Sequence, residues 1–209
     1  AYIESNIDGF FNVLECCRWN RVEHLVFASS SSVYGLNGKV PFSEKDSIAH
    51  PVSLYAASKK SNELMAHAYS HLYGIPVTGL RFFTGDMLRD FTYIDDIAEG
   101  VIRCIDRVAE PDPAWNAECP DPACSSAPYR IYNIGNSEPV RLMDFIAAVE
   151  AACEKEAVKE YLPMQPGDVY QTNADTSALQ RDMGYKPSKD IREGVRETVA
   201  WFKSYYHLE

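Results

Sequence analysis

Short apolar runs alternate along this chain with longer segments whose apolar residues recur every three or four positions. Runs of the first kind predict buried strands, and segments of the second kind predict amphipathic helices. Strands are expected at residues 24–28, 77–83, 130–134 and near Tyr161. Helices are expected at residues 3–18, 53–73, 95–107, 142–154, shortly after Asp175 and at 191–205. Strands that alternate with helices form parallel βαβ units, so we expect an α/β fold with a doubly wound sheet and ligands at the carboxyl ends of its strands.

The first apolar run ends in the sequence VFASSSSVYG, residues 26–35, where four serines follow the strand. Serine is a poor strand former, and a hydroxyl buried without a partner costs roughly 1–3 kcal/mol. Because the serines stand at the carboxyl end of a predicted strand, we expect their hydroxyls to face a ligand. The alternative is that they satisfy backbone groups in a tight turn.

Tyr55 and Lys59 are four residues apart on the helix predicted at 53–73, so they share one face of that helix. A tyrosine and a lysine often occur at this spacing by chance, and Tyr185 and Lys189 form a second such pair. Pro187 lies inside the second pair and argues against a helix there. The first pair is the better candidate, because its helix lies between the serine-rich strand end and the next strand.

Charge and composition exclude several classes of partner. The formal net charge of -10 argues against binding to nucleic acid or to an anionic membrane surface. No apolar stretch approaches the roughly 20 residues of a membrane span and no signal peptide opens the sequence, so we expect a cytoplasmic protein. The six cysteines lack zinc-ligand spacing, and we expect reduced thiols and no metal. Asp95 and Asp96 resemble a metal-binding pair only superficially, and we expect a helix cap with a favourable negative charge in the first turn instead.

Seven stretches of the sequence resemble the extended short-chain dehydrogenase/reductase family, and within it the nucleotide-sugar 4-epimerases. These stretches are SNIDGFFNVLE, VFASSSSVYG, YAASK, LRFFT, RDFTYIDDIAEGV, YNIGNSEPV and MQPGDV. They cover nearly the whole chain, and the likeness is strongest to UDP-glucuronate 4-epimerases. The resemblance implies a Rossmann-like sheet, NAD as the cofactor, a UDP-sugar as the substrate, and an isomerase that transiently oxidises C4 of the sugar.

The family mechanism implies catalytic roles for Ser30, Tyr55 and Lys59. Tyr55 would take the proton from the sugar 4-hydroxyl while a hydride leaves C4 for NAD+. A tyrosine pKa is near 10, so a base at neutral pH needs a pKa lowered by about 3, or roughly 4 kcal/mol. The Lys59 ammonium and the positive nicotinamide ring would supply this, and Lys59 would also hold the nicotinamide ribose. Ser30 would hydrogen-bond the reacting oxygen.

Other positions carry over from the family one at a time. Asn6 matches a residue near the coenzyme, with a helix cap as the alternative. Arg89 matches an arginine that clamps the UDP diphosphate, with a surface ion pair as the alternative. The expected coenzyme-binding residues are Asn6, Ala28, Ser29, Tyr55, Lys59 and Phe82. The expected substrate-binding residues are Ser31, Ser32, Thr84, Arg89 and Asp168, the last near the uridine ribose.

The hydroxyls of Ser31, Ser32 and Thr84 bear on which sugar is bound. Galactose-type epimerases carry fewer hydroxyls here, and a carboxylate at sugar C5 needs donors because an ionised group desolvated without partners is very costly. UDP-glucuronate is therefore the expected substrate, with UDP-galacturonate as the product. The related dehydratases and decarboxylases place an acidic residue between the serines and Val-Tyr-Gly, and this sequence has none. A UDP-glucose or UDP-N-acetylglucosamine 4-epimerase, a dehydrogenase that releases its ketone, and a non-catalytic nucleotide-sugar-binding fragment stay as alternatives.

The resemblance also implies how the chain is divided. Residues 1–83 and about 92–135 would belong to the dinucleotide-binding domain, and residues about 84–91 and 136–209 to a smaller nucleotide-sugar-binding domain. Family members carry an N-terminal glycine-rich turn and a further segment after the threonine at position 84, and we expect both in the whole protein. A genuine deletion would remove half the coenzyme site and expose a sheet edge. The C-terminal His-Leu-Glu resembles the remnant of a purification tag.

A homodimer is expected from the same resemblance. In related proteins the helices that correspond to residues 3–18 and 53–73 pack against their copies as a four-helix bundle. Phe10, Leu64 and Tyr69 are the expected apolar contacts between the two copies.

Overall fold

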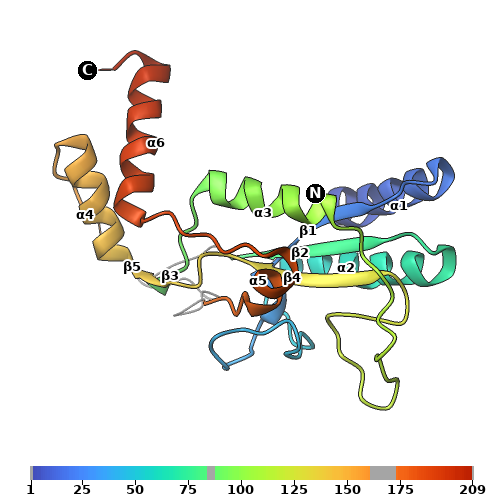
Figure 1. The fold of residues 1–209 in the computed structure, drawn as a ribbon. Helices are drawn as coiled ribbons and strands as arrows, with labels where there is room; N and C mark the ends of the chain where they lie inside the picture. The colour runs from blue at the N-terminus through green and yellow to red at the C-terminus, as the bar shows by residue number, and fades with distance from the viewer. Residues whose placement is uncertain (1, 84–87, 161–172, 209) are drawn as a thin grey trace.

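The computed structural model describes residues 2–83, 88–160 and 173–208 (Figure 1). Its helices are the π-helix η1 (Ile3–Asp8), α1 (Gly9–Asn20), the 3-10 helix η2 (Ser31–Tyr34), α2 (Leu54–Tyr73), α3 (Ile94–Asp106), α4 (Leu142–Cys153), α5 (Ser177–Met183) and α6 (Ile191–Tyr206). Its strands are β1 (Leu25–Ser30), β2 (Val77–Phe82), β3 (Leu88–Arg89), β4 (Tyr129–Ile134) and β5 (Val140–Arg141). The predicted elements are present with ends within a few residues, whereas the two-residue strands β3 and β5 were not predicted. The strand expected near Tyr161 lies outside the described residues.

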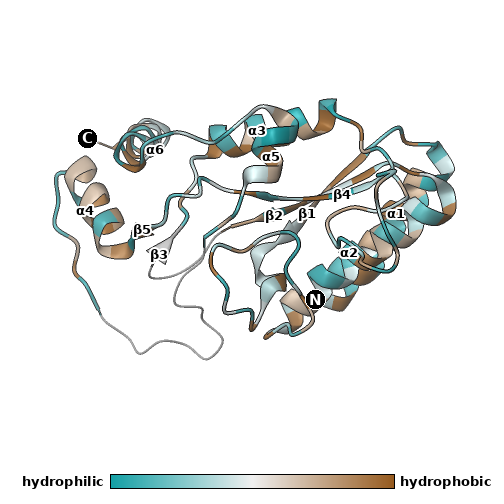
Figure 2. Cartoon of the chain, turned by 60° about the horizontal axis from the view of Figure 1, so that its bottom comes forward, coloured by the Kyte–Doolittle hydropathy of each residue, from teal (hydrophilic) through white to brown (hydrophobic). Residues whose placement is uncertain are grey.

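The central sheet is parallel and has the strand order β1-β2-β4. Helix α2 connects β1 to β2 and packs on one face, while α3 lies between β2 and β4 in the chain and covers the opposite face (Figure 2). This arrangement confirms the predicted doubly wound α/β fold. Strands β3 and β5 form a separate antiparallel pair.

The long helix α2 has clear local signals at both ends. The Ser53 hydroxyl accepts a hydrogen bond from the backbone N–H of Ala56 at 3.1 Å, which satisfies one of the free donors of the first turn. The helix ends at Gly74, whose φ of 66° is left-handed and suits glycine. These signals fix where α2 begins, and therefore place Tyr55 and Lys59 in its first two turns.

Two apolar clusters hold the helices against the sheet. Cys17 of α1 and Ala66 of α2 pack with Phe27 and Ile131 on one face. On the other face the buried cluster consists of Leu80, Cys104, Tyr132, Ile134 and Leu179, which come from β2, α3, β4 and α5. Alternate residues of each strand serve the two faces, as expected for strands covered on both sides.

Helices α4 and α6 pack against each other apart from the sheet (Figure 1). The resemblance assigned all of 136–209 to a second domain, but α5 lies on the sheet, where the Leu179 side chain is fully buried. The division into two domains stays a prediction. All six thiols are free. Within residues 2–83, 88–160 and 173–208 no helix has both the length and the apolar character needed to cross a bilayer.

Candidate active site

Helix α2 brings Lys59 to the end of the serine-bearing strand. The Lys59 Nζ donates a hydrogen bond to the backbone carbonyl of Ala28 at 3.0 Å, two residues before Ser30. The same nitrogen lies 6.0 Å from the centre of the Tyr55 ring. Burial lowers the pKa of the Lys59 amine from its ordinary value. The predicted tyrosine and lysine therefore share one face of α2, and that face is directed at the carboxyl end of β1.

The Tyr55 side chain is half-buried, and its ring packs against Tyr2 with centroids 5.7 Å apart. The Ser58 hydroxyl donates to the Tyr55 carbonyl at 2.7 Å and accepts from the Asn6 amide at 2.9 Å. Asn6 lies inside η1, so the alternative of a helix cap is wrong. Its side chain instead ties η1 to the turn of α2 that carries Tyr55.

Three of the four serine hydroxyls form hydrogen bonds within the protein, that of Ser29 in the interior and those of Ser30 and Ser32 in the turn. Ser29 is buried and donates to Glu63 Oε1 at 2.6 Å, so any contact of Ser29 with a coenzyme falls to its backbone. Ser30 caps η2 by accepting from the backbone N–H of Ser32 at 3.2 Å, and the Ser32 hydroxyl donates to Ser30 Oγ at 3.0 Å. The turn alternative therefore accounts for some of the hydroxyl contacts.

Only some of the remaining expected site residues lie within the described part of the chain. Phe82 pairs in register with Ser30 at the ends of β2 and β1, so it stands at the same edge of the sheet. The backbone of Arg89 forms part of β3. Thr84 and Asp168 lie outside the described residues.

The helix at Asp95 and Asp96 begins differently from the expectation. Helix α3 starts at Ile94 and neither aspartate is its N-cap, although both lie in its first turn, where a negative charge is favourable. Asp96 accepts hydrogen bonds from the backbone N–H groups of Ser188 and Lys189 at 3.0 and 2.8 Å. It therefore anchors the loop before α6. Sequence spacing gave no signal for a contact between positions so far apart.

A chain of buried polar side chains behind the serines was not predicted. Arg81 forms a two-pronged ion pair with Glu63, with Nε–Oε1 and Nη2–Oε2 distances of 2.8 Å. Arg81 also donates to the Tyr34 hydroxyl at 3.0 Å, and that hydroxyl donates to Asn133 Oδ1 at 2.7 Å. The available signal was Glu63 itself, which follows Lys59 by four residues and so shares its helix face.

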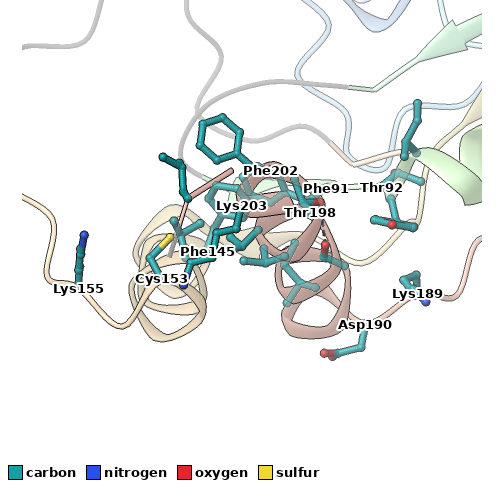
Figure 3. Close-up of a pocket in the computed structure, with 18 residues that line it drawn as sticks. Phe91, Thr92, Phe145, Cys153, Lys155, Lys189, Asp190, Thr198, Phe202 and Lys203 are labelled. Carbon is teal, nitrogen blue, oxygen red and sulfur yellow. Dashed lines mark hydrogen bonds between the residues drawn. The ribbon is translucent and has the colours of Figure 1, made fainter. Parts of the chain in front are cut away.

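A groove of about 850 Å³ lies between α4 and α6 (Figure 3). Phe91, Phe145 and Phe202 line it together with aliphatic side chains. Tyr55, Lys59 and the serines of the β1 end do not line this groove, so it is separate from the candidate active site.

Comparison with known proteins shows the family to which this chain belongs. The profile described as "NAD dependent epimerase/dehydratase family" matches residues 1–84. The chain is 40% identical to the "Probable UDP-glucuronate 4-epimerase" of Rhizobium meliloti (strain 1021), over 99% of this chain and 70% of the relative. That match runs over 240 residues against the 209 of this chain, so the relative carries residues within the aligned range that this chain does not.

Solved structures show the same likeness. UDP-N-acetylglucosamine 4-epimerase from Methanobrevibacter ruminantium M1, in complex with UDP-N-acetylmuramic acid, superposes with a TM-score of 0.80 and 26% identity, over 97% of this chain and 70% of that chain. UDP-glucuronic acid 4-epimerase from Bacillus cereus, in complex with UDP-glucuronic acid and NAD, gives a TM-score of 0.76 and 25% identity, over 98% of this chain and 69% of that chain.

Proposed function

The chain belongs to the NAD-dependent epimerase/dehydratase family, and we propose from this that it interconverts UDP-glucuronate and UDP-galacturonate by inversion at C4. At the coarser level, it is an NAD-dependent UDP-sugar 4-epimerase, which its family and its likeness to UDP-sugar 4-epimerases support. The observation that carries the proposal is the hydrogen bond from the Lys59 amine to the Ala28 carbonyl. Because of this contact, the tyrosine and lysine pair lies beside the serine end of β1.

The residues present fit the nicotinamide end of a bound NAD. A half-buried ammonium lies at the carboxyl edge of a parallel sheet, where dinucleotides bind in this class of fold. Lys59 would hold the nicotinamide ribose, and Phe82 and the backbone at Ala28 and Ser29 would lie beside the coenzyme. When bound, NAD+ supplies the acceptor that takes the hydride from C4 and returns it.

Tyr55, Lys59 and Ser30 have separate roles in the proposed proton transfer. Tyr55 removes the proton of the sugar 4-hydroxyl as the C4 hydride departs, which leaves a 4-keto sugar and an uncharged phenol. The Lys59 ammonium stabilises the Tyr55 phenolate before that transfer. Ser30 donates a hydrogen bond to the reacting oxygen. Once the keto sugar has turned over in the site, Tyr55 would give the proton back to the 4-oxygen.

The choice of a glucuronate rests on the donors at the end of β1. Ser31 and Ser32 add hydroxyls beyond Ser30, and an ionised sugar carboxylate needs such donors once it leaves water. Arg89 and Asp168 are the proposed contacts of the diphosphate and the uridine ribose. The hydrogen bond that the Ser32 hydroxyl donates to Ser30 Oγ favours a second candidate, a UDP-glucose or UDP-N-acetylglucosamine 4-epimerase, since a hydroxyl whose proton is used in the turn is less free for a carboxylate.

The test is to incubate the whole protein in parallel with UDP-glucuronate, UDP-glucose and UDP-N-acetylglucosamine and to identify the products by NMR. The proposal expects UDP-galacturonate from the first substrate at a much higher kcat/KM, with no net accumulation of NADH. A preference for a neutral sugar would replace UDP-glucuronate by the second candidate. Stoichiometric NADH would contradict epimerisation altogether.

A further inference from the structure

Three buried polar residues form one row across the carboxyl end of the sheet. Ser29 of β1 pairs in register with Arg81 of β2, and Arg81 pairs with Asn133 of β4. Their exposed fractions are 3%, 1% and 0%. A guanidinium buried to this degree is very costly unless it is paired and hydrogen-bonded. The partners of Arg81 therefore decide which parts of the chain this row connects.

Glu63 is the charged partner of this row. Both of its carboxylate oxygens accept from Arg81, and Oε1 also accepts from the Ser29 hydroxyl at 2.6 Å. Glu63 is itself only 3% exposed. It follows Tyr55 by eight residues and Lys59 by four, so the three side chains form one stripe along α2. The stripe thus carries the catalytic pair at one end and the ion pair at the other.

A second contact of Arg81 is made on the C-terminal side of the serine segment. Arg81 Nη1 donates to the hydroxyl of Tyr34, the last residue of η2, and that hydroxyl in turn donates to Asn133. Tyr34 is 1% exposed. Ser30 to Ser32 therefore lie between two anchors, Ser29 and Tyr34, and both anchors converge on the Glu63–Arg81 pair.

We propose that the Glu63–Arg81 ion pair is a positioning unit that holds the serine segment in register with the Tyr55–Lys59 face of α2. This inference rests on the proposed function. Side chains alternate along a strand, so the contact of Ser29 with Glu63 fixes the direction in which Ser30 leaves β1. Hydrogen-bonded proton transfer tolerates little misplacement of its groups, which gives an anchor of this kind a direct effect on turnover.

Ser29→Ala tests the proposal, because it removes the link from β1 while the ion pair stays intact. We expect kcat to fall about tenfold with KM for the UDP-sugar nearly unchanged, since the loss concerns alignment in the transition state. Ser70→Ala is the matched control: Ser70, in α2, is a buried serine like Ser29, and its hydroxyl donates to the Pro128 carbonyl at 3.0 Å. It loses a comparable hydrogen bond away from the catalytic pair, so its kcat should match the native value.

Amide hydrogen exchange gives a readout that does not depend on turnover. The Ser29→Ala change should speed exchange at the Ser32 and Gly35 amides, which close the η2 turn, whereas Ser70→Ala should not. Equal kcat and equal exchange in the two variants would overturn the positioning role. If the native protein converts no UDP-sugar, the proposed function fails, and the exchange experiment alone then decides whether the pair anchors the serine segment.

Tyr34→Phe probes the second anchor independently. It removes the hydroxyl between Arg81 and Asn133 but keeps the ring, which stacks on Phe42 with centroids 4.7 Å apart. We expect the same pattern as for Ser29→Ala, a lower kcat at nearly constant KM. Native kcat in this variant would show that η2 needs no anchor at its far end, and would contradict the convergence of the two anchors.

Discussion

Lys59 is the residue whose surroundings say most about the chemistry of the site. Its amine is half-buried and donates a hydrogen bond to the Ala28 carbonyl, and burial lowers the pKa of this amine from its ordinary value. A desolvated ammonium gains more from a nearby negative charge than an exposed one, because the effective dielectric constant is lower. A Tyr55 phenolate and the Lys59 ammonium would therefore stabilise each other, as the proposed function requires.

Tyr55→Phe should reduce kcat by about 100-fold or more, since it removes the hydroxyl proposed to accept and return the proton. Binding of the UDP-sugar, measured by calorimetry, should be nearly unchanged because the ring and its packing are kept. Tyr2→Phe is the control, as Tyr2 is the aromatic neighbour of Tyr55 and has no proposed part in proton transfer. Activity retained in Tyr55→Phe would remove Tyr55 from its role.

Glu44 makes the stability of the fold sensitive to pH. It is 3% exposed and accepts from the backbone N–H of Asn133 at 2.8 Å. Burial raises its pKa from the ordinary 4.5 to about 7, the charge of Asp175 acts in the same direction, and Arg81 opposes it. Between pH 4.5 and about pH 7, Glu44 therefore keeps a proton in the folded protein that the unfolded chain has released.

A raised carboxyl pKa contributes stability that is present below about pH 4.5 and is lost as pH rises through about 7. By linkage the loss at this residue is about 3 kcal/mol. Glu44→Gln, which imitates the protonated acid, should lose less stability than the native protein between pH 5 and pH 8. Urea unfolding of both proteins at the two pH values measures the difference. An identical pH dependence in the two would contradict the assignment.

At the level of elements, β2 is the strand on which the tight packing of the sheet depends. It lies between β1 and β4 and has α2 and α3 on its two faces. Gly79 stands in the middle of it, where a Cβ atom would come within 2.5 Å of Ile131 Cδ1 and 2.8 Å of Phe27 Cζ. The absence of a side chain is therefore what allows these two residues to meet across the strand.

Gly79→Ala should lower the free energy of unfolding by roughly 1–3 kcal/mol, because the added methyl overpacks a close contact. The gain in backbone entropy from replacing glycine offsets only part of this cost, about 0.5–1 kcal/mol. Gly38→Ala is the matched control, since a Cβ atom there meets nothing within 4 Å. The midpoint of urea unfolding should fall for the first variant and stay near native for the second. Equal midpoints would show that Phe27 and Ile131 adjust without cost.

For the molecule as a whole, the outer faces of α1 and α2 bear on assembly. Two of the three expected dimer contacts are used within the chain: Phe10 packs on Phe27 with ring centroids 5.2 Å apart, and the Tyr69 hydroxyl donates to Glu15. Leu64, by contrast, is 62% exposed, and Phe11 is 47% exposed. An apolar face therefore remains available, and the homodimer stays a prediction.

Leu64→Glu should convert a dimer at micromolar concentration into a monomer, because a carboxylate buried in an apolar interface without a partner is costly. Leu36→Glu provides the control, as Leu36 is 75% exposed but lies outside α1 and α2. Sedimentation velocity distinguishes the two. A monomeric native protein, or a dimer unaffected by Leu64→Glu, would contradict the predicted interface.

The sequence by itself determined the kind and order of the main elements and the pairing of Tyr55 with Lys59. Both follow from short-range physics: apolar periodicity sets helix or strand, and a spacing of four places two side chains on one helix face. The serine-rich end of β1 could likewise be predicted to face a ligand, since ligands bind at the carboxyl edge of such a sheet and the serines follow a strand.

Only the tertiary structure decided which polar groups meet. The Arg81–Glu63 pair, the contact of Lys59 with Ala28, and the role of Asp96 in holding a distant loop all join positions that no local pattern connects. Their partners are set by the strand register and by the way α2 and α3 lie on the sheet. A buried charge must find its partner in three dimensions, and the energetic cost of failing to do so is not visible in a one-dimensional pattern.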